Sequence, residues 1–344
     1  MSEATRSTVS GTKDRYDVVV VGGGAAGLSG AKILARSRRS VLVIDAGAPR
    51  NAPAEGVHNY LYAEGTAPER LREVGLAEAR GYGVDVIEGS ASAAALLADP
   101  APGAARFRLA VSTPGGGQRF VSARRLLLAT GLVDGLPQVP GMTERWGKDV
   151  LHCPYCHGWE VRDQAIGVVG TTTMGPVQVR LFRQLSEDVV YFQHTAPDPS
   201  QEQREEFAAL GVDHVTGQVT GVETDDGILS GLQMADGRVI ARQAVVVATT
   251  LRAREDLLGD LGLSVSEQTM GGSVGTYLQT GPSGATATAG VWAAGNLSAP
   301  MVQVIDAAAA GAGAGSAIHL DLLDEDVEVA VAVHRAQSTA GTRR

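Results

Sequence analysis

A glycine-rich turn between a buried strand and a small-residue helix constrains the fold of this chain more than any other feature. The run from Tyr16 to Val21 is apolar and mostly β-branched, which is typical of strands buried inside a parallel sheet. It leads into the turn 22–27 (GGGAAG) and then into a predicted helix over 25–37. A second apolar run, 41–44, ends at Asp45. This order predicts a strand–helix–strand unit.

The glycines of this turn fit the pattern G-x-G-x-x-G. Gly22 would allow the tight turn, Gly24 would let a pyrophosphate approach the backbone, and Gly27 would let the helix pack on the strand. The positive end of the helix dipole would then face the phosphates. Asp45 follows the second strand, where a carboxylate accepts hydrogen bonds from ribose hydroxyls. A glycine-rich turn without a ligand would not need all these parts, so we expect a dinucleotide site.

A second copy of the same pattern occurs later in the chain. Strands are expected at 165–169 and 189–192, separated by the turn 170–175 and a helix. Further strands are expected at 125–130 and 245–248, with a linker at 135–141, and the segment 291–295 (VWAAG) precedes a small-residue helix expected at 302–319. The predicted fold class is α/β, with two doubly wound, Rossmann-like domains and the second inserted into the first. We expect a polar leader over 1–15, a first domain over 16–134 and 253–325, an inserted domain over 135–252 and a tail over 326–344.

Charge and hydropathy exclude several classes of partner. The 344-residue chain has a net charge of −9 and no basic stripe, which argues against nucleic acids and anionic membranes. No run approaches the roughly 18 apolar residues that span a bilayer. Residues 1–15 are polar and lack the apolar centre of a signal peptide. We therefore expect a cytoplasmic protein.

The two cysteines, Cys153 and Cys156, form a Cys-x-x-Cys pair followed by His157. Attachment of c-type haem would require export, and zinc would require a second ligand pair, since His152 and His157 are too close in sequence to complete a tetrahedral set. A structural pair is a third alternative. Redox chemistry is favoured, because two thiols this close form a labile disulfide with reactive thiolates. With an ordinary pKa of about 6.5, His157 could carry protons near neutral pH. No metal is expected.

These motifs together resemble the low-molecular-weight thioredoxin reductases, which are FAD-dependent pyridine nucleotide-disulfide oxidoreductases. The resemblance covers about residues 16–323. It rests on VVVVGGGAAG at 18–27, LLLATG at 126–131, CPYCHGWE at 153–160 and GVWAAGN followed by VQV at 290–304.

The resemblance implies that the chain binds FAD. Asn296 stands where the family has an aspartate on the ribityl chain, and an amide can still donate and accept there. The residues implied in FAD binding are Gly22, Gly24, Ala25, Ala26, Gly27, Asp45, Ala46, Arg50, Asn51, Asn59, Ala129, Thr130, Gly131, Asn296, Gln303 and Val304. The implied catalytic residues are Cys153, which would attack the substrate, Cys156, which would face the flavin, and His157. The family is commonly homodimeric.

Two departures from the family concern the second nucleotide turn. Thr172 occupies the position of the second glycine, so a β-branched side chain stands where a pyrophosphate should approach. The family's cluster of arginines for the 2′-phosphate of NADPH is replaced by residues 193–198 (QHTAPD). Losing two charged hydrogen bonds of about 1.5–3 kcal/mol each would weaken NADPH binding by roughly two to four orders of magnitude. We therefore do not expect tight NADPH binding.

The third departure is His157, where the reductases have an aspartate. The segment CPYCHG resembles the dithiol oxidases that close disulfides in small natural products such as gliotoxin and holomycin, and whose flavin is reoxidised by oxygen. The leading prediction is a dithiol oxidase acting on a small molecule. The alternatives are an NAD(P)H-dependent reductase of thioredoxin or a similar protein, and a non-catalytic flavin-binding sensor. The loop 57–65 is expected to shape the substrate pocket.

Overall fold

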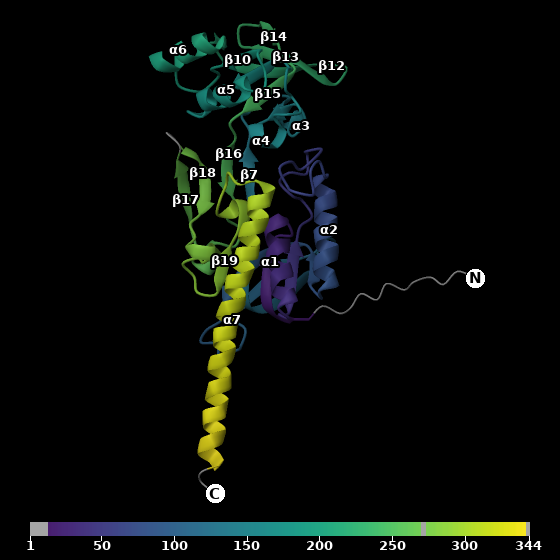
Figure 1. Ribbon diagram of the computed structural model, residues 1–344, viewed down its shortest axis with the longest axis vertical. Coiled ribbons are helices and arrows are strands. Elements are labelled where there is room, and N and C mark those ends of the chain that lie inside the picture. Colours follow the sequence, from purple (N-terminus) through teal and green to yellow (C-terminus); the bar gives the residue numbers. More distant parts are fainter. Residues whose placement is uncertain (1–12, 270–272, 342–344) are drawn as a thin grey trace, which may run out of the picture.

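The computed structural model describes residues 13–269 and 273–341, and its largest sheet is built around the first predicted strand (Figure 1). Strand β1 (Arg15–Val21) lies between β2 (Val41–Asp45) and β6 (Gln118–Leu128), and both pairings are parallel. The order is β3-β2-β1-β6-β5-β4, and β19 pairs with the second half of β6. The other strands are β3 (Asp85–Glu88), β4 (Ser90–Leu96), β5 (Phe107–Ser112) and β19 (Val291–Ala293). The predicted strand–helix–strand unit is confirmed.

Two helices pack against each other on this sheet through small residues. They are α1 (Ala25–Arg36) and α7 (Val304–Gly341), which lie side by side in Figure 1. A Cβ atom at Gly311 would come within 1.9 Å of the Ala26 carbonyl oxygen, so only glycine permits this approach. The expected helix 302–319 is therefore present, but it continues to Gly341, and its last turns extend away from the sheets. Helix α2 (Pro68–Gly81) also covers α1.

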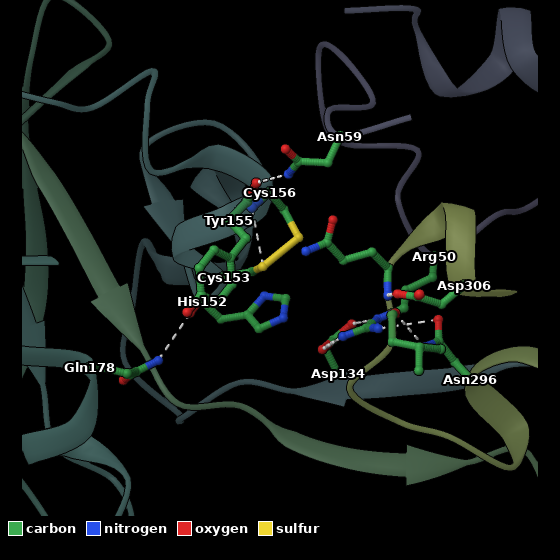
Figure 2. Close-up of a disulfide and its surroundings, with 12 residues drawn as sticks. Arg50, Asn59, Asp134, His152, Cys153, Tyr155, Cys156, Gln178, Asn296 and Asp306 are labelled. Carbon is green, nitrogen blue, oxygen red and sulfur yellow. Dashed lines mark hydrogen bonds and ion pairs between the residues drawn. A yellow bond between two sulfur atoms is a disulfide. The ribbon is translucent and has the colours of Figure 1, made fainter. Parts of the chain in front are cut away.

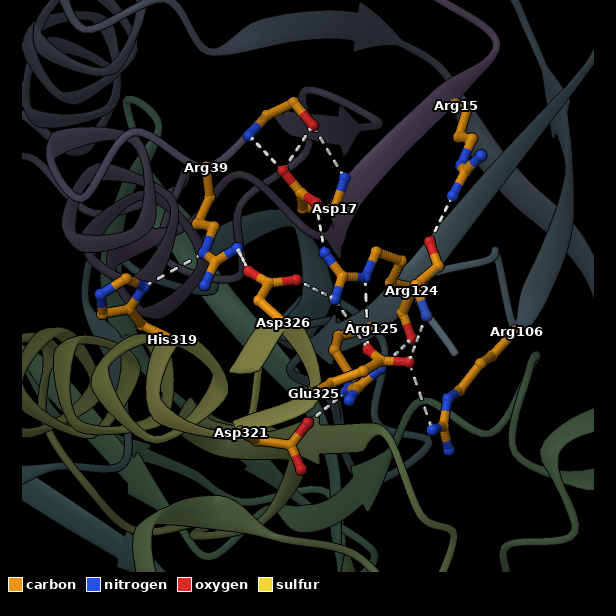
Figure 3. Close-up of polar contacts among 12 residues, drawn as sticks. Arg15, Asp17, Arg39, Arg106, Arg124, Arg125, His319, Asp321, Glu325 and Asp326 are labelled. Carbon is orange, nitrogen blue, oxygen red and sulfur yellow. Dashed lines mark hydrogen bonds and ion pairs between the residues drawn. The ribbon is translucent and has the colours of Figure 1, made fainter. Parts of the chain in front are cut away.

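A network of buried charges fastens α7 to the sheet (Figure 3). The carboxylate of Glu325 on α7 lies 2.9 Å from a guanidinium nitrogen of Arg124 and 3.0 Å from one of Arg125, both on β6. Burial alone would raise the pKa of Glu325, but the Gly103 N–H and the two guanidinium groups outweigh it and lower that pKa to about 2. Asp326 accepts a second bond from Arg124 at 2.6 Å. These ion pairs join segments that are distant in sequence.

A second, wholly parallel sheet follows the second predicted copy of the pattern. Its order is β11-β10-β9-β15-β8. The strands are β8 (Val150–Leu151), β9 (Ile166–Val169), β10 (Val189–Phe192), β11 (Asp213–Val215) and β15 (Ala244–Val247), with helices α5 (Gly175–Arg183) and α6 (Gln201–Leu210). An antiparallel sheet of β12 (Val219–Asp225), β13 (Ile228–Met234) and β14 (Val239–Ala241) adjoins it. The predicted α/β class with two doubly wound sheets is confirmed.

A small sheet lies where the chain passes between the two parallel sheets. Strands β7 (Leu132–Gly135) and β16 (Thr250–Ala253) pair antiparallel, and β17 (Val265–Thr269) and β18 (Ser273–Leu278) complete the sheet. The short helices are α3 (Met142–Arg145) and α4 (Pro154–His157), with 3-10 turns at Gly259–Leu261, Pro282–Gly284 and Gly295–Leu297. The exact domain bounds stay a prediction, and leader residues 1–12 lie outside the described residues.

Candidate active site

The cysteine pair forms a disulfide at the start of the short helix α4. Cys153 is extended and precedes the helix, and its sulfur accepts a hydrogen bond of 3.2 Å from the Cys156 N–H. Tyr155, between the cysteines, is exposed. An amide aimed at the Cys153 sulfur would stabilise a thiolate there after the disulfide opens.

The disulfide and the predicted dinucleotide site open into one cavity of about 1020 Å³. The disulfide and the first glycine turn line the same cavity, although the turn follows a strand of the large sheet and the cysteines lie beside the second parallel sheet. Cavity-lining residues among those predicted from the sequence are Gly22, Gly24, Ala25, Ala26, Asp45, Ala46, Arg50, Asn51, Ala129, Thr130, Gly131, Asn296, Gln303, Val304, Cys153, Cys156 and His157. The predicted residues Gly27 and Asn59 do not line it. Loop residues such as Val57 and Tyr60 do.

The first glycine turn has the space that a dinucleotide needs. A Cβ atom at Gly24 would meet nothing within 4 Å in the described protein, whereas one at Gly22 would collide with the Ala129 carbonyl at 2.2 Å. One at Gly27 would lie 1.9 Å from the Gly22 carbonyl oxygen. Gly24 therefore leaves open backbone beside the cavity, while Gly22 and Gly27 permit tight packing. The start of α1 is free of side-chain caps among the described residues, so its N–H groups can meet phosphate oxygens.

Two polar groups beside this turn have contrasting surroundings. The carboxylate of Asp45 already accepts bonds from the Gly23 N–H at 3.1 Å and the Arg72 guanidinium at 2.8 Å. The buried hydroxyl of Thr130 has no hydrogen-bond partner within the described residues. An unpaired buried hydroxyl at the cavity wall fits a site completed by a bound polar group. These features fit FAD.

Arg50 lines the cavity and contacts side chains from two other segments, Asp134 and Asn296 (Figure 2). Its guanidinium binds both carboxylate oxygens of Asp134 at 2.6 and 2.7 Å and donates to the Asn296 side-chain oxygen at 3.3 Å. The Asn296 amide nitrogen donates to the carbonyls of Ala299, Pro300 and Val302 at 3.1–3.2 Å. The Asn296 side chain thus holds the segment that leads into the predicted flavin contacts Gln303 and Val304.

His152 and Gln178 lie beside the disulfide and were missed by sequence reasoning. Burial, together with the charge of Arg50, lowers the pKa of His152 to about 4, so its ring is neutral at pH 7. The ring stacks on Trp146 with the centroids 5.5 Å apart. Gln178 on α5 donates to the His152 carbonyl at 3.1 Å. No local pattern marks these residues, because their roles arise from contacts between separate elements.

His157, at the end of α4, is a partly buried base. Burial lowers its pKa, Glu160 raises it and His58 lowers it further. Its Nε2 atom has no hydrogen-bond partner among the described residues. A neutral imidazole in this position can accept a proton at pH 7.

The predicted cofactor residue Asn59 contacts the cysteine segment. Its side-chain nitrogen donates to the Tyr155 carbonyl at 2.6 Å. The neighbouring His58 ring lies edge-on to His157, with the centroids 6.4 Å apart. His58 was also missed, since a single histidine in a loop carries no pattern.

In the second nucleotide turn, the Thr172 side chain stands at the position where Gly24 leaves the backbone of the first turn accessible. The Thr172 hydroxyl accepts a bond from the Met174 N–H at 3.2 Å, and the Thr171 hydroxyl donates to the Ala248 carbonyl at 2.7 Å. A Cβ atom at Gly170 would lie 2.4 Å from the Tyr191 hydroxyl, and one at Gly175 would lie 2.8 Å from the Tyr191 ring. Both glycines therefore make room for Tyr191.

The end of β10 carries no cationic side chain from 193 to 198 apart from the histidine. Gln193 donates to Asp198, and the His194 ring accepts a bond of 3.1 Å from the Val219 N–H. Burial lowers the pKa of His194, which favours its neutral form. This surface has an acidic group where a 2′-phosphate would need basic ones.

Within residues 13–269 and 273–341, no helix is both long and apolar enough to cross a membrane. No group of three or more histidine, cysteine or acidic side chains in that part of the chain is arranged to hold a metal ion.

Comparison with known proteins gives matches over nearly the whole chain. The pyridine nucleotide-disulphide oxidoreductase family matches residues 16–313. Thioredoxin reductase tcpT of Claviceps purpurea is 29% identical over 311 residues, which cover 86% of this chain and 91% of the relative. A probable thioredoxin reductase of Arthroderma benhamiae is 32% identical over 182 residues, 53% of this chain and 44% of that protein. The crystal structure of HlmI has a TM-score of 0.84 and 40% identity, covering 96% of this chain and 98% of HlmI.

Proposed function

The chain belongs to the pyridine nucleotide-disulphide oxidoreductase family, and from this premise we propose that it is a dithiol oxidase. It is an FAD-dependent enzyme that exchanges electrons between FAD and sulfur, as the resemblance in its sequence implied. In the proposed reaction a small-molecule dithiol and O2 give the cyclic disulfide and H2O2.

One observation carries this choice: the contrast between the two glycine turns. Gly24 leaves open backbone at the cavity, whereas Thr172 fills the equivalent position of the second turn and Tyr191 occupies the space under its glycines. A pyridine nucleotide would meet the Thr172 side chain where its pyrophosphate should approach the backbone, and it would meet no arginine at 193–198. A chain that binds NADPH poorly must receive its electrons elsewhere, and the disulfide in the cavity wall is the available entry point.

The cysteine pair would perform the sulfur chemistry. A substrate thiolate attacks Cys153, the Cys153–Cys156 bond breaks, and Cys156 leaves as a thiolate. The second substrate thiolate then attacks the substrate sulfur bound to Cys153, which closes the substrate disulfide and leaves two electrons on the cysteine pair. The Cys156 N–H stabilises the departing Cys153 thiolate.

Oxidation of the dithiol releases two protons and two electrons. His157 accepts a proton from a substrate thiol, because burial keeps its ring neutral near pH 7. FAD held in the cavity would supply a two-electron acceptor for the reduced Cys153–Cys156 pair, with O2 as the final acceptor. The two thiol protons end on the peroxide. In this proposal the predicted cofactor residues at 22–27, 45–51, 129–131 and 296–304 hold FAD, and Asn59 holds the cysteine segment instead.

A disulfide reductase driven by a pyridine nucleotide is the second candidate. It is favoured by the complete strand–turn–helix of the second sheet and by the names of the relatives, which are thioredoxin reductases. Its substrate would be a disulfide of thioredoxin or a similar protein.

Anaerobic titration of the purified flavoprotein separates the two functions. We expect dithiothreitol to bleach the flavin absorbance, air to restore it, and H2O2 to appear in a one-to-one ratio with oxidised dithiol. NADPH and NADH, mixed rapidly at the same concentration, should leave the absorbance unchanged over many turnover times. Bleaching by NADPH within one turnover would reject the oxidase and support the reductase.

A further inference from the structure

The loop 57–66, which belongs to the same half of the molecule as the first glycine turn, lies against the cysteine segment. The Val57 N–H donates to the Thr66 carbonyl at 2.8 Å, and the Gly65 N–H donates to the Val57 carbonyl at 2.9 Å, so the ends of the loop 57–66 are tied together. Asn59 and Tyr62 have φ values of 59° and 73°, which side chains other than glycine rarely adopt. Backbone strain of this kind persists only where surrounding contacts impose it.

Glu64 supplies such contacts to His58 and Asn59 from inside the loop. One carboxylate oxygen accepts a bond of 2.9 Å from the Asn59 N–H, and the other lies 2.7 Å from Nδ1 of His58. Asn59 in turn donates to the Tyr155 carbonyl between the two cysteines. Glu64 therefore holds one histidine and one amide in place against the cysteine segment.

His58 and Glu160 meet His157 together. Nε2 of His58 lies 3.5 Å from a carboxylate oxygen of Glu160, and the His58 ring is edge-on to His157 at 6.4 Å. The groups around His157 are the disulfide of Cys156 on its own helix with Cys153 before it, Glu160 after it, His58 from the loop, and His152 before the cysteines. Of these, His58 and Glu160 have opposite charges when ionised.

We propose that His58 is a positioning residue for His157: anchored by Glu64 and set against Glu160, it controls how readily His157 takes the proton of the substrate thiol. This inference rests on the proposed function, because it assigns His157 the role of base in the dithiol reaction. After burial, which is the largest effect, Glu160 raises the pKa of His157 and His58 lowers it. The two groups thus act on His157 in opposite directions.

The test is the pH dependence of flavin bleaching by dithiothreitol in anaerobic stopped flow. The rate should rise on the acidic limb as His157 loses its proton. H58Q removes the group that lowers the pKa of His157, so the acidic limb should shift to higher pH. E160Q removes the group that raises it, so the limb should shift to lower pH. The thiols of dithiothreitol titrate identically in every experiment.

The control is H334Q, which makes the same substitution at an exposed histidine of α7 and should leave the profile unchanged. H58N serves as a second neutral replacement, and the flavin spectrum of each variant reports correct folding. Shifts of opposite sign in H58Q and E160Q support the inference. Profiles that do not move, or that move in the same direction, overturn it. A wild-type protein that dithiothreitol does not bleach would instead reject the proposed function.

Discussion

Asn296 illustrates how far the role of one residue depends on the atoms around it. The sequence placed an amide where related reductases have a carboxylate, and the structure surrounds its nitrogen with the carbonyls of Ala299, Pro300 and Val302. A carboxylate has no proton to donate to them. The amide is therefore required by the segment that leads into α7, a constraint that is visible only after folding.

Replacement of Asn296 by aspartate should accordingly destabilise the protein. N296D removes the two N–H donors that three carbonyls share and sets a negative oxygen against those carbonyls, which should cost on the order of 1–3 kcal/mol and loosen flavin binding. Thermal unfolding and the flavin-to-protein absorbance ratio measure both effects. N51D makes the same change of charge elsewhere in the cavity wall. An equal loss in N51D would mean that charge alone explains the result.

The roles of the two cysteines can be separated by single substitutions. In C156S the Cys153 thiol remains, and we expect it to attack a substrate disulfide, release one substrate thiol and stay as a stable mixed disulfide, while flavin bleaching by dithiols is lost. Mass spectrometry of the intact protein detects the adduct. C153S should form much less of it, because the sulfur that bonds to the substrate in the proposed reaction is absent. The reverse pattern would exchange the roles of Cys153 and Cys156.

At the scale of elements, α7 depends on its buried ion pairs. E325Q removes the carboxylate that Arg124 and Arg125 share, while both arginines keep other aspartate partners, so the loss should be about 1–3 kcal/mol. Urea unfolding at pH 7 should show a loss of this order. E328Q, on an exposed position of the same helix, should change stability by less than about 0.5 kcal/mol. Similar losses in both variants would contradict a specific role for Glu325.

The same carboxylate predicts a pH dependence. The pKa of Glu325 is lowered to about 2 in the folded protein, so its contribution is fully present above the ordinary glutamate value of 4.5. The contribution is lost as the pH falls from that value toward 2, because the unfolded chain takes up the proton first. Between pH 5 and pH 3, wild type should therefore lose more stability than E325Q. Parallel curves would show that other groups dominate.

Elements with a strong local signal were predicted well, and contacts between elements were not. The strands β1, β2, β9 and β10 and the two glycine turns follow from apolar runs and glycine spacing. The end of α7 was missed, because its valines have modest helix propensity and its anchor is a set of ion pairs to β6. His58 and His152 were missed for the same reason: their neighbours come from other parts of the chain.

At the scale of the whole molecule, the two parallel sheets share an architecture but differ at their glycine turns. Only the first turn leaves open backbone, at Gly24, and it faces the cavity that the disulfide also lines. The second sheet positions the cysteine segment and Gln178 at that cavity. In this interpretation the second parallel sheet and its helices position the disulfide at the cavity. The glycines of the second turn allow close packing within that domain and do not bind a nucleotide.

Thermal unfolding with added nucleotides tests this division of roles. A ligand that binds only the folded state stabilises it by about 2.7 kcal/mol at one hundred times its Kd. FAD added to protein stripped of flavin should therefore raise the Tm in proportion to the logarithm of its concentration. NADPH added to the FAD-loaded protein should leave the Tm unchanged up to millimolar concentrations, since Thr172 stands where its pyrophosphate would approach and Asp198 repels its 2′-phosphate. A rise with NADPH comparable to that with FAD would show that the second turn still binds a nucleotide.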